Sequence, residues 1–198
     1  MPKLPNQEEV FTKYFKPWYD KDELEYRGHE ETLPDTESWG KPGAAAELVS
    51  PLTDEGQKMM KEQIEEIYQA AKEDWPDFLG VKDEVSLDWV EAFDQYFDKE
   101  KVAELLESSD PEEFSNELVV LSCELGAVIG NSMIQEDPEL KWMADCPYWE
   151  SAIYDIRTGF RVNVFHWAIK KFSSYEHKDG MKARILQCLE KIKNSQMQ

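Results

Sequence analysis

Apolar residues recur at helical spacing through most of this chain, and each run starts at a residue type that caps helices well. Helices are predicted to start at Asn6, Thr53, Ser86 and Asp98. The second of them is expected to end near Asp74, where the sequence WPDFLG interrupts the pattern. Residues 17–52 hold seven Pro and Gly residues and are predicted to form a long loop that packs on the body through its aromatic side chains.

The longest helix is predicted over residues 111–137. Asp110 is placed as its N-cap, Pro111 at its first position, and Glu113 where it completes a capping box. One broad face of this helix is large and apolar, with Phe114, Leu118, Leu121, Leu125, Val128 and Ile129. The opposite face is small, with Val119, Cys123, Gly126, Ala127 and Gly130. Only a narrow stripe is polar: Glu117, Glu124 and Asn131.

A helix that is apolar on two faces is expected to lie between two layers of the fold. Gly126 and Gly130 each cost about 1 kcal/mol relative to alanine in a helix interior. We therefore expect a sheet or a crossing helix to approach the small face closely enough to offset that cost. A phosphate-binding glycine loop would have to follow a strand, and this stretch does not.

Alternating patterns predict three strands at 141–145, 151–156 and 160–164, the last two joined as a hairpin. Asn163 is expected to cap a helix that reaches Phe172, and a final helix is expected from Asp179. The fold class predicted is α+β and mainly helical, with the long central helix packed against a small three-stranded antiparallel meander and further helices. We expect residues 1–52 to form an N-terminal helix and arm on the body, and residues 53–198 to form a single domain.

The order of elements from the long helix to the sequence RVNVFHWAIKKF resembles a module found in many bacterial proteins. Some of those proteins are immunity proteins, which neutralise polymorphic toxins. The resemblance covers about residues 111–175, less than half of the chain, and carries over no functional residue. It implies an α+β module and, for the immunity proteins, binding to another protein rather than catalysis.

Charge is unevenly distributed along the chain. The 198 residues have a formal net charge of −20. Residues 51–150 hold 27 acidic and 7 basic side chains, whereas residues 151–198 hold 4 and 9. Such a surface repels nucleic acid and anionic membranes and attracts a basic protein partner at long range. The acids expected to form this surface are Asp83, Glu84, Asp88, Glu91, Asp94, Asp98 and Glu112.

Cysteine usage and the N-terminus indicate a cytoplasmic protein. Cys123, Cys146 and Cys188 are odd in number and lack metal-ligand spacing, so reduced thiols are expected. The sequence MPKLPNQEEV has no apolar run that would form a secretory signal. No catalytic residue, metal ligand or cofactor is assigned, because no motif for nucleophilic, metal or phosphate chemistry is present.

The first functional hypothesis is therefore a non-catalytic, immunity-type inhibitor that covers a basic toxin or effector protein with its acidic surface. The alternative is an enzyme or small-ligand-binding protein in which residues 17–39 form a lid. Its pocket would be lined by Trp18, Trp39, Tyr148 and His166. A third hypothesis is a structural subunit that dimerises through the long helix, so the chain is expected to be a monomer or a homodimer.

Overall fold

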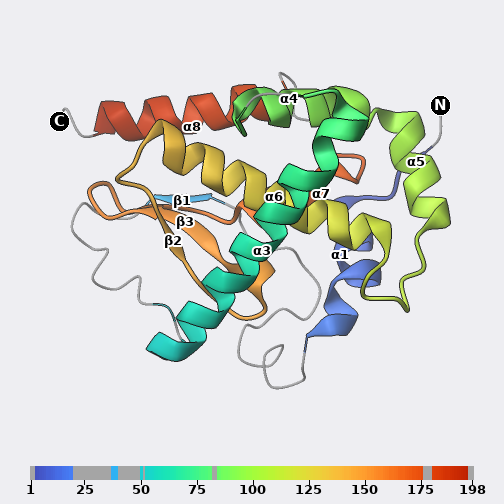
Figure 1. Ribbon diagram of the computed structural model, residues 1–198, viewed down its shortest axis with the longest axis horizontal. Helices are drawn as coiled ribbons and strands as arrows, with labels where there is room; N and C mark the ends of the chain where they lie inside the picture. The colour runs from blue at the N-terminus through green and yellow to red at the C-terminus, as the bar shows by residue number, and fades with distance from the viewer. Residues whose placement is uncertain are drawn as a thin grey trace.

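The computed structural model describes residues 3–19, 37–39, 50, 52–81, 84–175 and 180–195. Helices and one small antiparallel sheet make up the described chain, so the predicted α+β, mainly helical class is confirmed (Figure 1). The helices are α1 (Gln7–Tyr14), α3 (Asp54–Leu79), α4 (Leu87–Tyr96), α5 (Lys99–Ser108), α6 (Glu117–Glu136), α7 (Val164–Lys171) and α8 (Met181–Ser195). Short 3-10 helices occupy Lys16–Trp18 and Tyr148–Glu150.

The four helix starts predicted near the N-terminus and in the middle of the chain are confirmed by side-chain caps. Asn6 and Glu9 form a reciprocal capping box at α1. Thr53 accepts a hydrogen bond from the Gly56 backbone N–H. Ser86 and Asp98 accept in the same way at α4 and α5.

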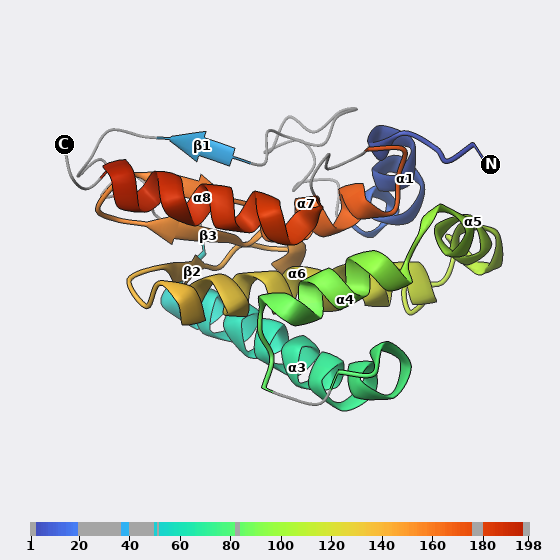
Figure 2. The ribbon, with the colours of Figure 1, turned by 90° about the horizontal axis from the view of Figure 1, so that it is seen from above.

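Helix α6 lies at the centre of the molecule, as the two apolar faces predicted. Seen from above, α3 lies on one side of α6, and α7, α8 and the sheet lie on the other (Figure 2). Helix α4 also packs on α6. Helix α6 lies within the core, since its buried residues include Val128, Ile129 and Gly130.

The start of α6 was predicted wrongly. The helix begins at Glu117 and is capped by Asn116, whose Oδ1 accepts from the Val119 N–H at 3.0 Å. Asp110 instead closes a local turn by accepting from the Glu112 N–H at 2.9 Å. An Asp side chain makes the same bond in a turn as at a helix cap, so the sequence alone does not separate the two. Phe114 consequently precedes the helix and is 42% exposed.

The predicted end of α3 was also wrong, because the helix continues through Pro76 to Leu79. Proline removes one backbone hydrogen bond and normally ends a helix. Here Trp75 is fully buried and its ring lies 4.6 Å from that of Phe93, so packing holds the last turn in place. Gly80, with φ of 70°, then ends the helix in the left-handed region.

The sheet has four strands, not three, in the order β1-β4-β3-β2, and all neighbours are antiparallel. The predicted meander is present as β2 (Lys141–Met143), β3 (Ala152–Asp155) and β4 (Phe160–Val162). The additional edge strand β1 (Glu37–Trp39) lies in the segment predicted to be a loop. Three residues are too few to show alternation, and their partner β4 is more than 100 residues away in the sequence.

The small face of α6 explains the two glycines. A Cβ built on Gly126 would lie 2.3 Å from Phe165 Cδ1 and 2.9 Å from the Phe165 Cα. A Cβ on Gly130 would lie 2.1 Å from Cζ2 of Trp142. Both expected kinds of neighbour are therefore present, since Phe165 belongs to the crossing helix α7 and Trp142 to strand β2.

Helix α6 is long and apolar enough to cross a membrane, but 78% of its most apolar stretch is buried inside the protein. A core helix surrounded by other elements has these properties. In the part of the chain that is described, no other helix has this length and composition.

We predict that Gly126→Ala destabilises the protein by about 1–3 kcal/mol, although alanine is the better helix former. The added methyl group would collide with the backbone of Phe165, which cannot move without displacing α7. Urea denaturation followed by circular dichroism measures the effect. The matched control is Gly56→Ala in the first turn of α3, where the nearest atoms lie at 3.4 Å. A Gly126→Ala protein as stable as the Gly56→Ala protein would contradict the close-packing explanation.

Candidate functional site

The acids predicted on α4 face the basic C-terminal helix of the same chain. Lys182 Nζ of α8 lies 2.6 Å from Asp88 Oδ1 and 2.7 Å from Glu91 Oε2. Asp94 is bonded to Lys171 Nζ at 2.5 Å and accepts from the Met181 N–H at 3.3 Å. Part of the basic charge near the C-terminus is therefore paired within the chain, between α4 and the helices α7 and α8.

The other predicted acids have different surroundings. Asp98 accepts from the backbone N–H groups of Glu100 and Lys101, which lower the pKa of its carboxyl. Glu84 and Glu112 are exposed. Asp83 lies outside the described residues. The structure thus brings Asp88, Glu91 and Asp94 together on α4 and leaves Glu112 on a separate loop.

A denser group of acids lies on α5 and the loop that leads to α6, and we call residues 98–117 the acidic end. It contains eight acidic residues and only Lys99 and Lys101 as bases. The eight acids are all exposed: Asp98, Glu100, Glu104, Glu107, Asp110, Glu112, Glu113 and Glu117. Only Asp98 and Glu112 of this group belong to the acidic surface predicted from the sequence. The excess of acidic over basic residues in 98–117 is the sequence feature that indicates the other six acids.

Repulsion between the like charges of the acidic end destabilises the isolated protein. Glu100, Glu104 and Glu107 are spaced four and three residues apart, so they share one face of α5. Like charges at this spacing cost about 0.2–0.5 kcal/mol per pair. No ion pair formed between described residues includes any of these three carboxylates. Within the described part of the chain, these three carboxylates are therefore not neutralised by an ion pair.

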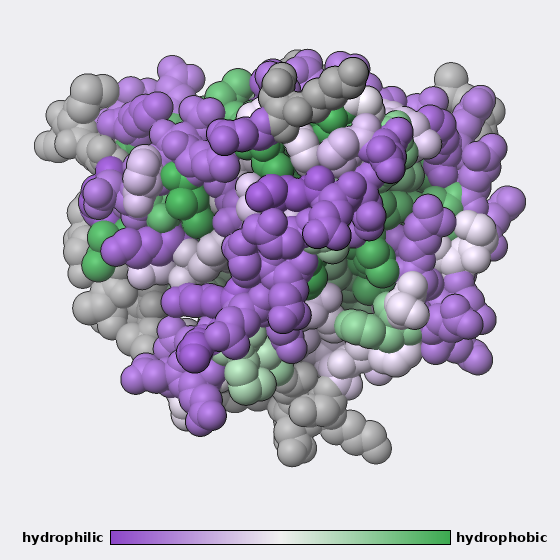
Figure 3. All heavy atoms as spheres, viewed as in Figure 1, coloured by the Kyte–Doolittle hydropathy of each residue, from purple (hydrophilic) through white to green (hydrophobic). Residues whose placement is uncertain are grey.

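Beside the acidic end is a groove of about 470 Å³ between α3, α4, α5 and α6. Aromatic and aliphatic side chains form its floor: Phe78, Tyr96, Phe97, Leu105 and Leu121. Glu104 and Glu117 line the same groove and are exposed. In the space-filling view, hydrophobic atoms are visible between α3 and α5, with hydrophilic atoms on both sides (Figure 3).

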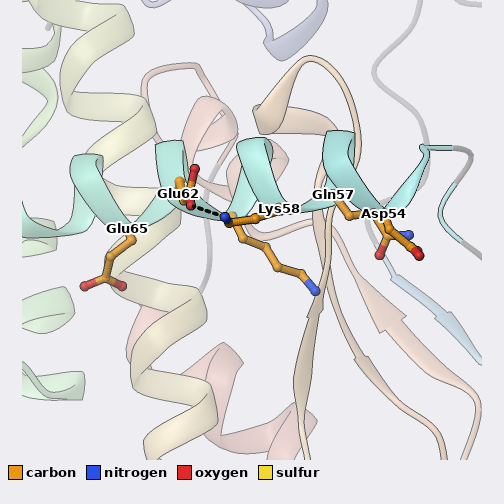
Figure 4. A pocket seen from close by; sticks show the side chains of 6 residues that line it. Asp54, Gln57, Lys58, Glu62 and Glu65 are labelled. Carbon is orange, nitrogen blue, oxygen red and sulfur yellow. Dashed lines mark ion pairs between the residues drawn. The ribbon is translucent and has the colours of Figure 1, made fainter.

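A second hollow, of about 490 Å³, lies along the outer face of α3. Asp54, Gln57, Lys58, Glu62 and Glu65 all project from this one helix (Figure 4). Lys58 and Glu62 pair with each other at 3.6 Å, and none of the described residues that line the hollow is aromatic. Its mixed charges offer little selectivity, so we assign it no role.

The described residues among those proposed for a ligand pocket each contact other side chains of the protein. His166 is fully buried, and its Nε2 lies 3.1 Å from Oε1 of Glu150. Tyr148, half-buried, donates its hydroxyl to Cys123 Sγ at 3.3 Å, and burial raises the pKa of both groups, that of the Cys123 thiol to about 12. Trp18 packs edge-to-face on Phe114.

The pocket hypothesis also depends on residues outside this description. The side chain of Trp39 and residues 20–36, most of the proposed lid, lie outside the described part of the chain.

A buried polar cluster that the sequence does not predict surrounds His166. Tyr19 donates its hydroxyl to the buried carboxylate of Glu150 and accepts a hydrogen bond from Trp149 Nε1 at 3.0 Å. The cluster therefore ties the segment after α1 to the start of α7. Its three polar side chains, those of Tyr19, Glu150 and His166, are all at least 94% buried, which fits a structural contact better than a reaction site.

Glu124 on α6 is a second buried acid, only 4% exposed. It accepts a hydrogen bond from Trp75 Nε1 at 2.8 Å. Burial raises the pKa of its carboxyl to about 7, against a partial lowering by the Trp75 bond. Glu124, which belongs to the polar stripe of α6, is thus buried in the core with a hydrogen-bond partner.

Among the described residues, no group of three or more His, Cys, Asp or Glu side chains is placed so that it could hold a metal ion. Comparisons with protein-family models, with curated proteins and with solved structures give no match for this chain.

We predict that Glu124 makes stability depend on pH. Because its folded pKa lies above the ordinary value of 4.5, its contribution is fully present below pH 4.5 and is lost as the pH rises through about 7. Glu124→Gln keeps the acceptor for Trp75 but cannot ionise. The variant should gain about 2 kcal/mol relative to the wild type between pH 5 and pH 8.

Urea denaturation at several pH values measures this difference. The control is Glu117→Gln, at an exposed position on the same helix. A difference between Glu124→Gln and the wild type that stays constant across this pH range would contradict the assignment.

Proposed function

We propose that this chain is a non-catalytic binding protein that associates with a basic protein partner through its acidic end. The observation that carries this proposal is the exposure of all eight acids in residues 98–117, with only two bases among them. Concentrated like charge weakens a compact fold unless a partner of opposite charge covers it. The acidic end therefore suits binding better than stability.

The α4 acids, which belong to the acidic surface predicted from the sequence, are less suited to this role. Asp88 and Glu91 already share Lys182, and Asp94 is bonded to Lys171. A partner would have to compete with these bases. At the acidic end, by contrast, a lysine or arginine from outside meets carboxylates that form no ion pair within the described structure.

In its most specific form, the proposed protein is an immunity-type inhibitor in the bacterial cytoplasm. It covers the surface of a basic toxin or effector enzyme. Inhibition would be steric, and the carboxylates would occupy positions where that enzyme binds phosphates. Complementary charge mainly raises the association rate, and salt screens it. Support comes from the net charge of −20 and from the resemblance of residues 111–175 to a module of many bacterial proteins, most of them uncharacterised and some of them immunity proteins.

We predict that Glu107→Lys/Glu112→Lys/Glu113→Lys abolishes capture of a basic partner. The test is affinity capture from lysate of the source cells at roughly 50 and 300 mM salt, with mass-spectrometric identification. The wild type should retain one stoichiometric basic protein at low salt and less of it at high salt. The triple variant should retain none of this protein at either salt, because association without the acidic charge is slower by about tenfold or more.

The matched control is Glu136→Lys/Glu139→Lys/Glu190→Lys, which changes the net charge equally at exposed positions elsewhere. Equal loss in both variants would show that only the total charge matters. Equal retention in both, or no basic protein bound to the wild type, would contradict the proposal.

A further inference from the structure

The groove beside the acidic end combines an apolar floor with a charged border. Its floor is aromatic and aliphatic, while its border carries exposed carboxylates. Its volume of about 470 Å³ falls within the range of sites that bind side chains or small ligands. An apolar floor alone would fit any hydrophobic segment, so the charges must decide what fits.

The aromatic wall of the groove already holds a cation. Lys101 Nζ lies 3.3 Å from the centroid of the Tyr96 ring. Phe78 packs edge-to-face on the same ring, with centroids 5.3 Å apart, and this contact fixes the orientation of the ring. An ammonium over a tyrosine face is stabilised by about 0.5–2 kcal/mol. The Tyr96 face of the groove therefore accommodates a positive charge.

The border of the groove excludes several classes of occupant. Nucleic acid and anionic lipid would meet Glu104 and Glu117 as like charges. A purely apolar helix would cover these two carboxylates and leave them without water or a counter-ion, at a cost of several kcal/mol per ion. A segment that is only charged would leave Phe78 and Leu121 in contact with water. Only an occupant with both basic and apolar side chains satisfies the floor and the border together.

We infer that the groove binds a cationic amphipathic segment of the basic partner, an inference that rests on the proposed function. Apolar side chains of the segment lie on Phe78, Leu105 and Leu121. Its lysine or arginine side chains pair with Glu104 and Glu117. One of these cations replaces Lys101 over Tyr96, which frees Lys101 to turn toward the solvent. This is the helix-in-groove mode of recognition, with charges at the edge setting the preferred partner.

The probe for this inference is a fluorescein-labelled peptide of roughly 14 residues, made of Leu and Lys with Leu at helical spacing. A second peptide keeps every Lys and replaces every Leu by Ser. Fluorescence anisotropy measures the affinity of each for the whole protein. The first peptide should bind the wild type at least about tenfold more tightly than the second.

Two variants test the groove itself. Ser108→Trp leaves the charge unchanged and places an indole in the groove from an exposed lining position. It should therefore lower the affinity for the Leu/Lys peptide by about tenfold. Glu104→Gln/Glu117→Gln should lower the affinity for the same peptide by about fivefold. The matched control, Glu62→Gln/Glu66→Gln, removes two exposed charges from α3 and should change affinity less than about twofold. Circular dichroism verifies that each variant folds.

Equal affinity for the two peptides, wild-type affinity in Ser108→Trp, or no binding of either peptide would overturn the inference. Its failure is distinguishable from failure of the proposed function, because Glu107, Glu112 and Glu113 do not line the groove. A partner lost by reversal of those three acids but retained by Ser108→Trp would leave the proposed function standing and remove the groove from it.

Discussion

The structure depends on the close approach of α7 and β2 to the small face of α6. Phe165 and Trp142 occupy the space that side chains at Gly126 and Gly130 would need, and this brings the α7–sheet layer against the central helix. The opposite face of α6 meets α3, where Glu124 bonds to Trp75. Because α6 is covered on both sides, its two ends are the positions where it meets the surface, and its N-terminal end leads directly into the acidic end.

Charge follows the same division. The basic C-terminal helix α8 lies against α4, and Lys182 pairs with two of the α4 acids, whose combined charge it offsets by one unit. Far fewer bases are present than acids, since the chain has 22 Lys and Arg residues and 42 Asp and Glu residues. The internal pairing uses part of the basic charge at α4, and α5 and the following loop remain acidic. The position of the proposed binding surface is therefore a consequence of where α8 packs, as much as of the local sequence.

The sequence predicted well those features that depend on local periodicity. The caps at Asn6, Thr53, Ser86, Asp98 and Asn163, the central position of the long helix and the close packing at its glycines are confirmed. Features that depend on distant partners were missed. Strand β1 exists because β4 pairs with it, and α3 passes Pro76 because Trp75 packs on Phe93.

The candidate site shows the same limit. The acidic character of residues 51–150 was predictable from composition, whereas the choice between α4 and α5 was not. That choice is set by Lys171 and Lys182, which lie far away in the sequence. The groove floor joins Phe78 to Leu121 from separate helices, and no periodicity in the sequence indicates that contact. The function as an immunity-type inhibitor stays a proposal.

The most direct measurement is zero-length cross-linking of carboxylates to amines in lysate of the source cells, followed by mass-spectrometric mapping of the linked residues. The account predicts that a basic partner is joined to the acidic end, at carboxylates such as Glu104, Glu107 and Glu117. Links confined to the outer face of α3, or no basic protein linked at all, would contradict it.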